Sequence, residues 1–244
     1  MITLLPLLFL LVMPVLAASP SVSEAIAKGD AAYARRSDPD QAQLALRFYE
    51  QALLADPQNT EAYWKASAAA WWAGEWLDER RARMDFFETG IRYGEKAVDL
   101  YPQSAEAHFW LGVNYGSFGD TKGVLKSLFL IKPIRSQMEI VNHLNERYQD
   151  GGADRVLGIL DYKVPGFAGG DKWRAGEWLK KAYDINPWNP ITLYYLGEYA
   201  SVQGDRAKAI EWLDKLQPDA FPTELHAELK LMQKKAAALR AKLK

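Results

Sequence analysis

Small, aromatic and acidic residues recur at a helical spacing along this chain. Gly112 is followed eight residues later by Asp120, and Gly197 is followed by Asp205 at the same distance. A glycine lets the two helices of a hairpin approach closely, and an aspartate at the turn can cap the second helix by accepting a backbone N–H. Sustained apolar/polar alternation rich in Val, Ile and Thr, which would indicate strands, is scarce. The pattern therefore predicts an all-α chain of helix hairpins.

Several segments fit one degenerate repeat. Leu111, Gly112 and Tyr115 have the L-G-x-x-Y spacing of a tetratricopeptide repeat, whose period is ~34 residues. Two other units have a pattern of alanine, a large residue, alanine and a helix-ending proline, at Ala45, Tyr49, Ala52 and Pro57 and at Ala175, Leu179, Ala182 and Pro187, and a third has its last two positions, Ala97 and Pro102. We therefore expect one α-solenoid domain over residues 18–244, made of about five degenerate tetratricopeptide-like helix hairpins with insertions and a C-terminal helix.

The chain departs from the plain repeat in three places. Around residues 75–87 an insertion of about ten residues lengthens the second unit. Pro133 interrupts what would be the second helix of the third unit, so we expect this helix to kink or to break into two shorter helices. Between Gly158 and Asp171 the extra length falls in KVPGFAGG, where a Pro-Gly and a Gly-Gly pair flank Phe167 and predict a structured turn.

This turn is a candidate functional element. Phe167 is a large apolar residue where a plain linker would be polar, which favours a role at an interface or at the mouth of a pore. The alternative is an elongated loop with no role of its own. The residues predicted for the interface or pore loop are Lys163, Val164, Pro165, Gly166, Phe167, Gly169, Gly170 and Asp171.

The N-terminal segment differs from the rest of the chain. It is an apolar run, MITLLPLLFLLVMPVLAA, without a charged side chain, and Val15 and Ala17 occupy the small-residue positions before a cleavage site. Residues 1–17 are therefore predicted to be a secretory signal peptide, which places the mature protein in the periplasm or outside the cell with no membrane span. An uncleaved membrane anchor is the alternative, although Pro6 and Pro14 would disturb a spanning helix. The chain has no cysteine, so it is not a lipoprotein.

Composition and motifs narrow the classes of function. Lys and Arg number 30 against 31 Asp and Glu, so a nucleic-acid partner, which needs a one-sided basic surface, is not expected. The three histidines, His108, His143 and His226, lie far apart in sequence, and no P-loop or G-x-S-x-G elbow is present. We therefore expect no catalytic residue, no metal site and no cofactor. Carboxylates brought together by folding would leave a hydrolase as the rival class.

A more specific pattern runs through residues 151–187. The segment GGADRVLGILDYKVPGFAGGDKWRAGEWLKKAYDINP contains a G-G, an L-G-x-L, a P-G-x-x-G-G-D and an A-x3-L-x2-A in this order. It resembles the signature of the T-component (TatT) family associated with TRAP transporters, and residues 126–133 are also similar. The resemblance implies an exported, non-enzymatic helical protein that forms a homotrimer with a pore through each subunit. It also implies pairing with the transporter's periplasmic solute-binding protein.

The same resemblance places certain first-helix positions on the concave face of the solenoid. Most of them are apolar or aromatic, which predicts a path for a small hydrophobic or amphipathic ligand, with Arg155 orienting an anionic headgroup. The alternatives are that the aromatic residues belong to the core and that the protein is a general protein-interaction module of the cell envelope. The predicted ligand-binding residues are Trp72, Phe109, Val113, Arg155, Ile159, Tyr162 and Tyr194.

Overall fold

The computed structural model describes residues 21–243, in which all regular elements are helical. The predicted signal peptide lies outside the described residues. Within them, no helix is long and apolar enough to cross a membrane. The α-helices are α1 (Val22–Tyr33), α2 (Pro39–Ala55), α3 (Thr60–Trp76), α4 (Arg80–Leu100), α5 (Ala105–Lys122), α6 (Ile131–Asn145), α7 (Gly152–Lys163), α8 (Lys172–Ile185), α9 (Pro190–Val202), α10 (Arg206–Asp214) and α11 (His226–Lys242). Short 3-10 helices are η1 (Val124–Lys126), η2 (Leu128–Leu130), η3 (Gly166–Ala168), η4 (Pro218–Ala220) and η5 (Thr223–Leu225).

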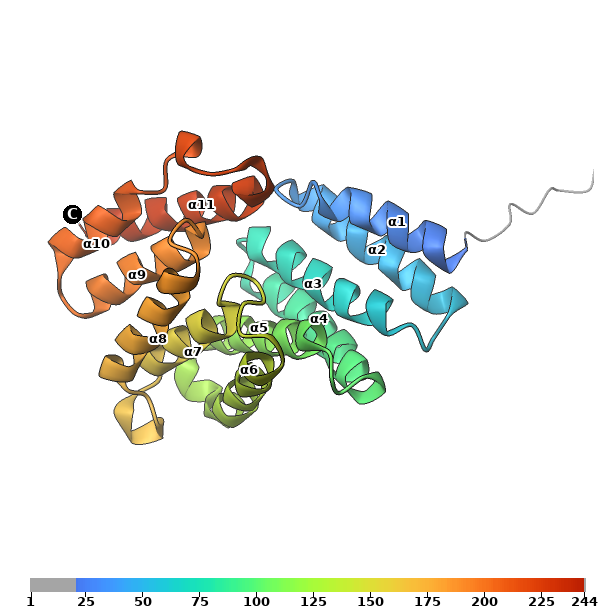
Figure 1. Ribbon diagram of the computed structural model, residues 1–244, viewed down its shortest axis with the longest axis horizontal. Helices are drawn as coiled ribbons and strands as arrows, with labels where there is room; N and C mark the ends of the chain where they lie inside the picture. The colour runs from blue at the N-terminus through green and yellow to red at the C-terminus, as the bar shows by residue number, and fades with distance from the viewer. Residues whose placement is uncertain (1–20, 244) are drawn as a thin grey trace, which may run out of the picture.

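The helices pair in chain order. Consecutive helices pack against each other as α1/α2, α3/α4, α5/α6, α7/α8 and α9/α10, and α11 packs against α9. The pairs stack into a curved solenoid (Figure 1). The predicted all-α fold of about five tetratricopeptide-like hairpins with a C-terminal helix is therefore confirmed.

The packing glycines of the repeat lie at the closest approaches within hairpins. A Cβ added to Gly158 would lie 2.8 Å from Cγ of Leu179, and one added to Gly197 would lie 2.9 Å from Cδ2 of Leu213. Both distances are shorter than real Cβ contacts. The leucine of the second helix therefore occupies the space that a side chain on the first helix would need.

Two of the three predicted aspartate caps are found. The Oδ1 atom of Asp171 accepts from the backbone N–H of Arg174 at 3.0 Å, and Asp205 caps α10 in the same way. The prediction for Asp120 was wrong, because α5 continues past it to Lys122. Asp120 instead presents its carboxylate to Lys163 on α7.

The predicted kink at Pro133 is also corrected. Pro133 is the third residue of α6, and the segment before it forms the 3-10 turns η1 and η2 rather than a first helix. Backbone N–H groups in the first turn of a helix have no intrahelical acceptor, so a proline there removes no hydrogen bond. The proline therefore marks the start of α6 instead of breaking it.

The last helix joins the two ends of the solenoid. Glu228 of α11 forms an ion pair with Arg36, which follows α1, with 2.6 Å between Oε1 and Nη2. Lys235 of α11 pairs with Glu75 of α3 at 2.6 Å. In Figure 1 α11 lies beside the ends of the N-terminal helices. The concave side is thus bounded by helices from both halves of the chain.

Candidate functional site: a cavity on the concave side

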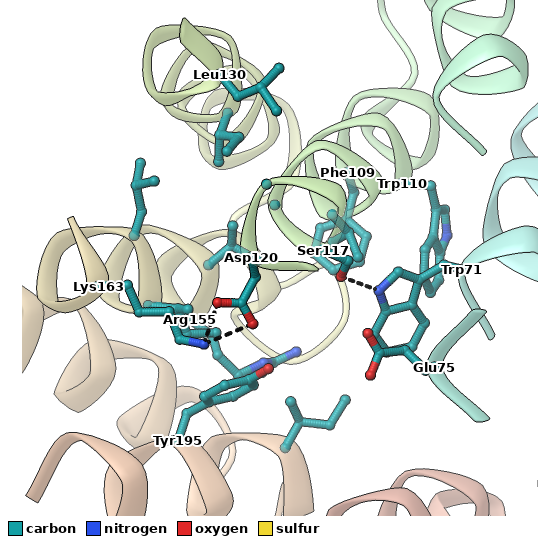
Figure 2. A pocket seen from close by; sticks show the side chains of 18 of the residues that line it. Trp71, Glu75, Phe109, Trp110, Ser117, Asp120, Leu130, Arg155, Lys163 and Tyr195 are labelled. Atoms are coloured by element: carbon teal, nitrogen blue, oxygen red, sulfur yellow. Dashed lines mark hydrogen bonds and ion pairs between the residues drawn. The ribbon is translucent and has the colours of Figure 1, made fainter. Parts of the chain in front are cut away.

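The solenoid bounds a cavity of about 160 Å³ on its concave side. One buried water needs roughly 10–15 Å³, so this space suits a small organic molecule better than a single water. The lining side chains come mainly from α3, α5 and α7, and α4, α6, α9 and α11 add others. Figure 2 shows these side chains converging on one space. The cavity is therefore formed by tertiary packing of most of the repeats.

Aromatic residues of α3 and α5 form one wall of the cavity. Trp71 packs edge-on against Trp72 with ring centroids 5.1 Å apart, and Trp71 lies 5.8 Å from Trp110. The indole N–H of Trp71 donates to Oγ of Ser117 at 2.8 Å, which fixes the orientation of this ring. Phe109 continues the wall, edge-on to Trp110 at 5.2 Å. Such rings offer a large apolar surface at fixed positions.

Aliphatic residues complete the apolar part. Leu130, just before α6, and Ile134, in its first turn, are buried, and Val156, Ile159 and Leu160 project from α7. Ile159 is half-buried: it packs against the cluster of Tyr162, Ala175 and Leu179 and also lines the cavity. Most of the cavity surface is therefore apolar, which is typical of sites for small organic molecules.

Charged residues line another part of the cavity as ion pairs. Lys163 lies 3.0 Å from Oδ1 of Asp120 (Figure 2). Glu75 is nearly fully buried between Lys235, at 2.6 Å, and Arg83, at 3.3 Å. Burial alone would raise the pKa of Glu75, but the two cations outweigh it and hold the pKa below its usual value. Glu75 is therefore ionised at neutral pH.

Arg155 is held by neutral acceptors. Its guanidinium donates to Oγ1 of Thr192 at 3.0 Å and to the backbone carbonyl of Gln149 at 3.0 Å. It is 3% exposed and lies within 4.0 Å of no carboxylate among residues 21–243. Burial lowers the pKa of Arg155 to about 10, so the side chain remains a cation at neutral pH.

The structure places the predicted ligand-binding residues in two groups. Five of them line the cavity, namely Trp72, Phe109, Val113, Arg155 and Ile159. Tyr162 and Tyr194 do not line it. Their hydroxyls both donate to the carboxylate of Glu198, and both side chains are buried in the packing around α7 and α9. The prediction that these two tyrosines line the channel is therefore corrected: their hydroxyl groups satisfy a carboxylate within the helix packing.

The loop after α7 adjoins the cavity at its first residues. Lys163 and Val164 line the cavity, whereas Phe167 in the 3-10 turn is 82% exposed. The loop is tightly fixed: Gly170 donates to the carbonyl of Pro165 at 3.2 Å. The amide of Asp171 donates to the carbonyl of Asp161 at 2.9 Å, and Arg174 donates to the carbonyl of Gly169 at 3.0 Å. The segment is thus an ordered turn that carries an exposed phenylalanine.

Some lining residues were not found by reasoning from the sequence. Glu228 and Lys235 belong to α11, which has no partner helix in the repeat pattern. Tyr195 follows the predicted Tyr194 by one position and lines the cavity in its place. The insertion that supplies Glu75 and Arg83 gave no signal beyond additional helix.

Metal binding and histidine chemistry are two alternatives for the described part of the chain. There, no group of three His, Asp or Glu side chains is arranged to hold a metal ion. His108, the one buried histidine among these residues, binds Gln137 and the carbonyl of Pro102, as expected for a packed helix histidine. The cavity is consequently the candidate site.

More than half of the chain matches the model of a known protein family. The family model described as Regulator of microtubule dynamics protein 1-3 matches residues 25–165. The chain belongs to this family. The match includes Arg155 and Lys163 but ends before α9 and α11, which supply Tyr195 and Lys235. The T-component signature remains a resemblance of residues 151–187.

A solved structure shows the tetratricopeptide-like fold. A thermophilic TPR protein of Thermus thermophilus is 16% identical and has a TM-score of 0.64, with 89% of this chain and 99% of that chain covered. MamA from Desulfovibrio magneticus RS-1 is 18% identical with a TM-score of 0.49, covering 80% of this chain and 92% of that one. YrrB, a TPR protein with an unusual peptide-binding site, is 20% identical with a TM-score of 0.45, covering 87% and 91%. No curated protein gives a significant match.

Proposed function

We propose that this protein is a non-catalytic binding protein that holds one small amphipathic organic molecule on the concave side of its solenoid. The observation that carries the proposal is the cavity of about 160 Å³, with an aromatic and aliphatic wall on one part and charged side chains on another. Apolar surface supplies affinity and a few fixed polar groups supply orientation. No arrangement of nucleophile and base is needed for this function.

Filling the cavity tests the proposal. Gly116 of α5 lines the cavity, and a Cβ added there would meet no atom within 4 Å. Gly116→Leu should therefore extend into the cavity and fill part of it. It should leave the free energy of unfolding near or above that of the wild type, because an interior helix glycine costs roughly 0.5–1 kcal/mol relative to Ala. Gly116→Ala is the matched control.

Binding is measured by calorimetry with 2-naphthoate and its neutral methyl ester. We expect at least one of the two probes to bind the wild-type protein and Gly116→Ala at one site per chain. Gly116→Leu should bind neither. A wild-type protein that binds neither probe, or a Gly116→Leu variant that binds as the wild type does, contradicts the proposal.

We also propose a setting for this binding, in which the protein is exported and serves a TRAP-type uptake system with a periplasmic solute-binding protein as partner and a homotrimer as the assembled form. The apolar N-terminal segment and the signature of residues 151–187 support this setting. Cleavage after Ala17 is tested by N-terminal sequencing of protein from the native host, and a retained Met1 would contradict it. Co-purification with a solute-binding protein encoded beside it tests the partner.

A second candidate function is docking of a protein partner at the loop of residues 163–171. Phe167 and Trp173, which lies in the first turn of α8, are 82% and 74% exposed, and large apolar side chains at such exposure are typical of interaction sites. The two candidates are compatible, because the loop begins at the cavity with Lys163. Loss of partner binding with unchanged probe binding on substitution of Phe167 would separate them.

A further inference from the structure

The charges that line the cavity do not balance. Its cations are Arg83, Arg155, Lys163 and Lys235, and its carboxylates are Glu75, Asp120 and Glu228. Arg83 and Lys235 pair with Glu75, and Lys163 pairs with Asp120. Glu228 pairs with Arg36. Within residues 21–243, Arg155 is therefore the lining cation that no carboxylate approaches within 4.0 Å.

The carboxylate of Asp150, which precedes α7, has partners other than Arg155. Arg155 donates to the backbone carbonyl of Asp150, whereas the side chain of Asp150 accepts from Asn186 at 3.0 Å and from Asn189 at 3.1 Å. The carboxylate of Asp150 thus serves the turn before α9. Neutral acceptors orient the guanidinium, but a buried cation without a counter-ion carries a large desolvation cost.

Tyr195 adds a second donor on the same side of the cavity. Its side chain lines the cavity, and its hydroxyl makes no hydrogen bond to another described residue. Burial raises the pKa of Tyr195, so the hydroxyl keeps its proton. In Figure 2 Arg155 and Tyr195 lie together, across the cavity from Leu130 and below the pair of Lys163 and Asp120.

We propose that Arg155 and Tyr195 form a subsite for the carboxylate of a monoanionic organic acid, whose apolar body packs against the wall formed by Trp71, Phe109 and Trp110. Nη1 of Arg155 donates to Thr192 and to the carbonyl of Asp150, and Nη2 donates once, to the carbonyl of Gln149. The Nε–H and the second N–H of Nη2 are left to donate two hydrogen bonds to a carboxylate, and the phenol supplies a third donor. A single negative charge matches the single unpaired lining cation, so a monocarboxylate fits better than a doubly charged phosphate ester. This inference rests on the proposed binding function and specifies its ligand class.

The test compares three naphthalene probes of one shape and different charge. 2-Naphthoate is the anion, methyl 2-naphthoate is neutral and 2-naphthylmethylammonium is the cation. In calorimetry with the full-length protein, 2-naphthoate should bind at least about tenfold more tightly than either of the others, since a hydrogen bond to a charged group exceeds the free energy of a tenfold change.

Substitutions of Arg155 and Tyr195 test whether these two residues cause the preference for the anionic probe. Arg155→Met should lower the affinity for 2-naphthoate about tenfold or more and leave the ester nearly unchanged, and Arg155→Lys should retain part of the preference. Tyr195→Phe should lower the affinity for 2-naphthoate a few-fold and leave the affinity for the other two probes unchanged. Arg147→Met is the control, because Arg147 is exposed near the same turn and forms no ion pair to another described residue. It should bind all three probes as the wild type does.

Each outcome decides one point. Equal binding of anion and ester by the wild type, or an anion preference that survives both Arg155→Met and Tyr195→Phe, overturns the carboxylate subsite and leaves the binding function standing. Failure of the wild type to bind any probe overturns the binding function as well. If Arg155→Met does not fold, Tyr195→Phe decides alone, because it removes one hydroxyl and no packing volume.

Discussion

Lys235 of α11 and Glu75 of α3 form an ion pair, with 2.6 Å between Nζ and Oε2, that links the C-terminal helix to the second hairpin. The side chain of Glu75 is 3% exposed and also contacts Arg83, so the pair is buried at the edge of the cavity. A repeat solenoid ordinarily has contacts only between neighbouring repeats. This pair instead ties together segments that the repeat order separates.

Removal of one partner from this pair should destabilise the whole fold. We expect Lys235→Met to lower the free energy of unfolding by about 3 kcal/mol, because it leaves the buried carboxylate of Glu75 with less compensation. Urea unfolding of wild type and variant measures the change. The control is Lys208→Met, which breaks the exposed pair with Glu211 and should change stability by less than about 1 kcal/mol. Equal effects of the two substitutions would contradict a special role for the buried pair.

The same carboxylate predicts a pH dependence. The pKa of Glu75 is lower in the folded protein than its usual value of 4.5, since Lys235 and Arg83 outweigh the effect of burial. A depressed pKa contributes stability above the unfolded value, and this stability is lost as the pH falls through the folded value. The melting temperature of wild type should exceed that of Glu75→Gln at pH 7, and the gap should close below pH ~4. A gap that stays constant down to pH ~3 would show that Glu75 acts through packing alone.

The turn after α7 should tolerate a methyl group at one glycine and not at another. A Cβ added to Gly170 would lie 1.8 Å from the carbonyl oxygen of Val164, whereas one added to Gly166 would meet nothing within 4 Å. We expect Gly170→Ala to lower the free energy of unfolding by ~2 kcal/mol or more, because backbone must move, and Gly166→Ala to change it by less than ~0.5 kcal/mol. Thermal unfolding of the two variants side by side measures this. Similar melting temperatures would show that the turn is not tightly fixed in solution.

Phe167 should contribute to association rather than to folding. Because its side chain is 82% exposed, Phe167→Ser should leave the free energy of unfolding within about 0.5 kcal/mol of wild type. Light scattering should show weaker self-association or partner binding. Leu54→Ser is the control, since Leu54 is 85% exposed on α2 and lies outside the loop. Unchanged assembly in the Phe167 variant would contradict a role of this loop in association.

The sequence by itself determined the helices and their pairing, because those depend on local spacing. Gly158 and Gly197 mark the close approaches in two hairpins, and Asp171 and Asp205 cap their second helices, as their positions in the repeat predicted. The resemblance to a known family also indicated Phe109 and Val113, which line the cavity.

Tertiary structure alone decided which polar groups meet at the site. Asp120 was expected to cap a helix and instead pairs with Lys163, because α5 continues beyond the point where the repeat pattern would end it. Tyr195, not Tyr194, lines the cavity, and Lys235 reaches Glu75 only because α11 returns to the first hairpins. Such contacts depend on small rotations between successive repeats that accumulate along the solenoid. The spacing of residues within one repeat does not determine the total of these rotations. The closure of the cavity and the unpaired charge of Arg155 could therefore be seen only in the folded chain.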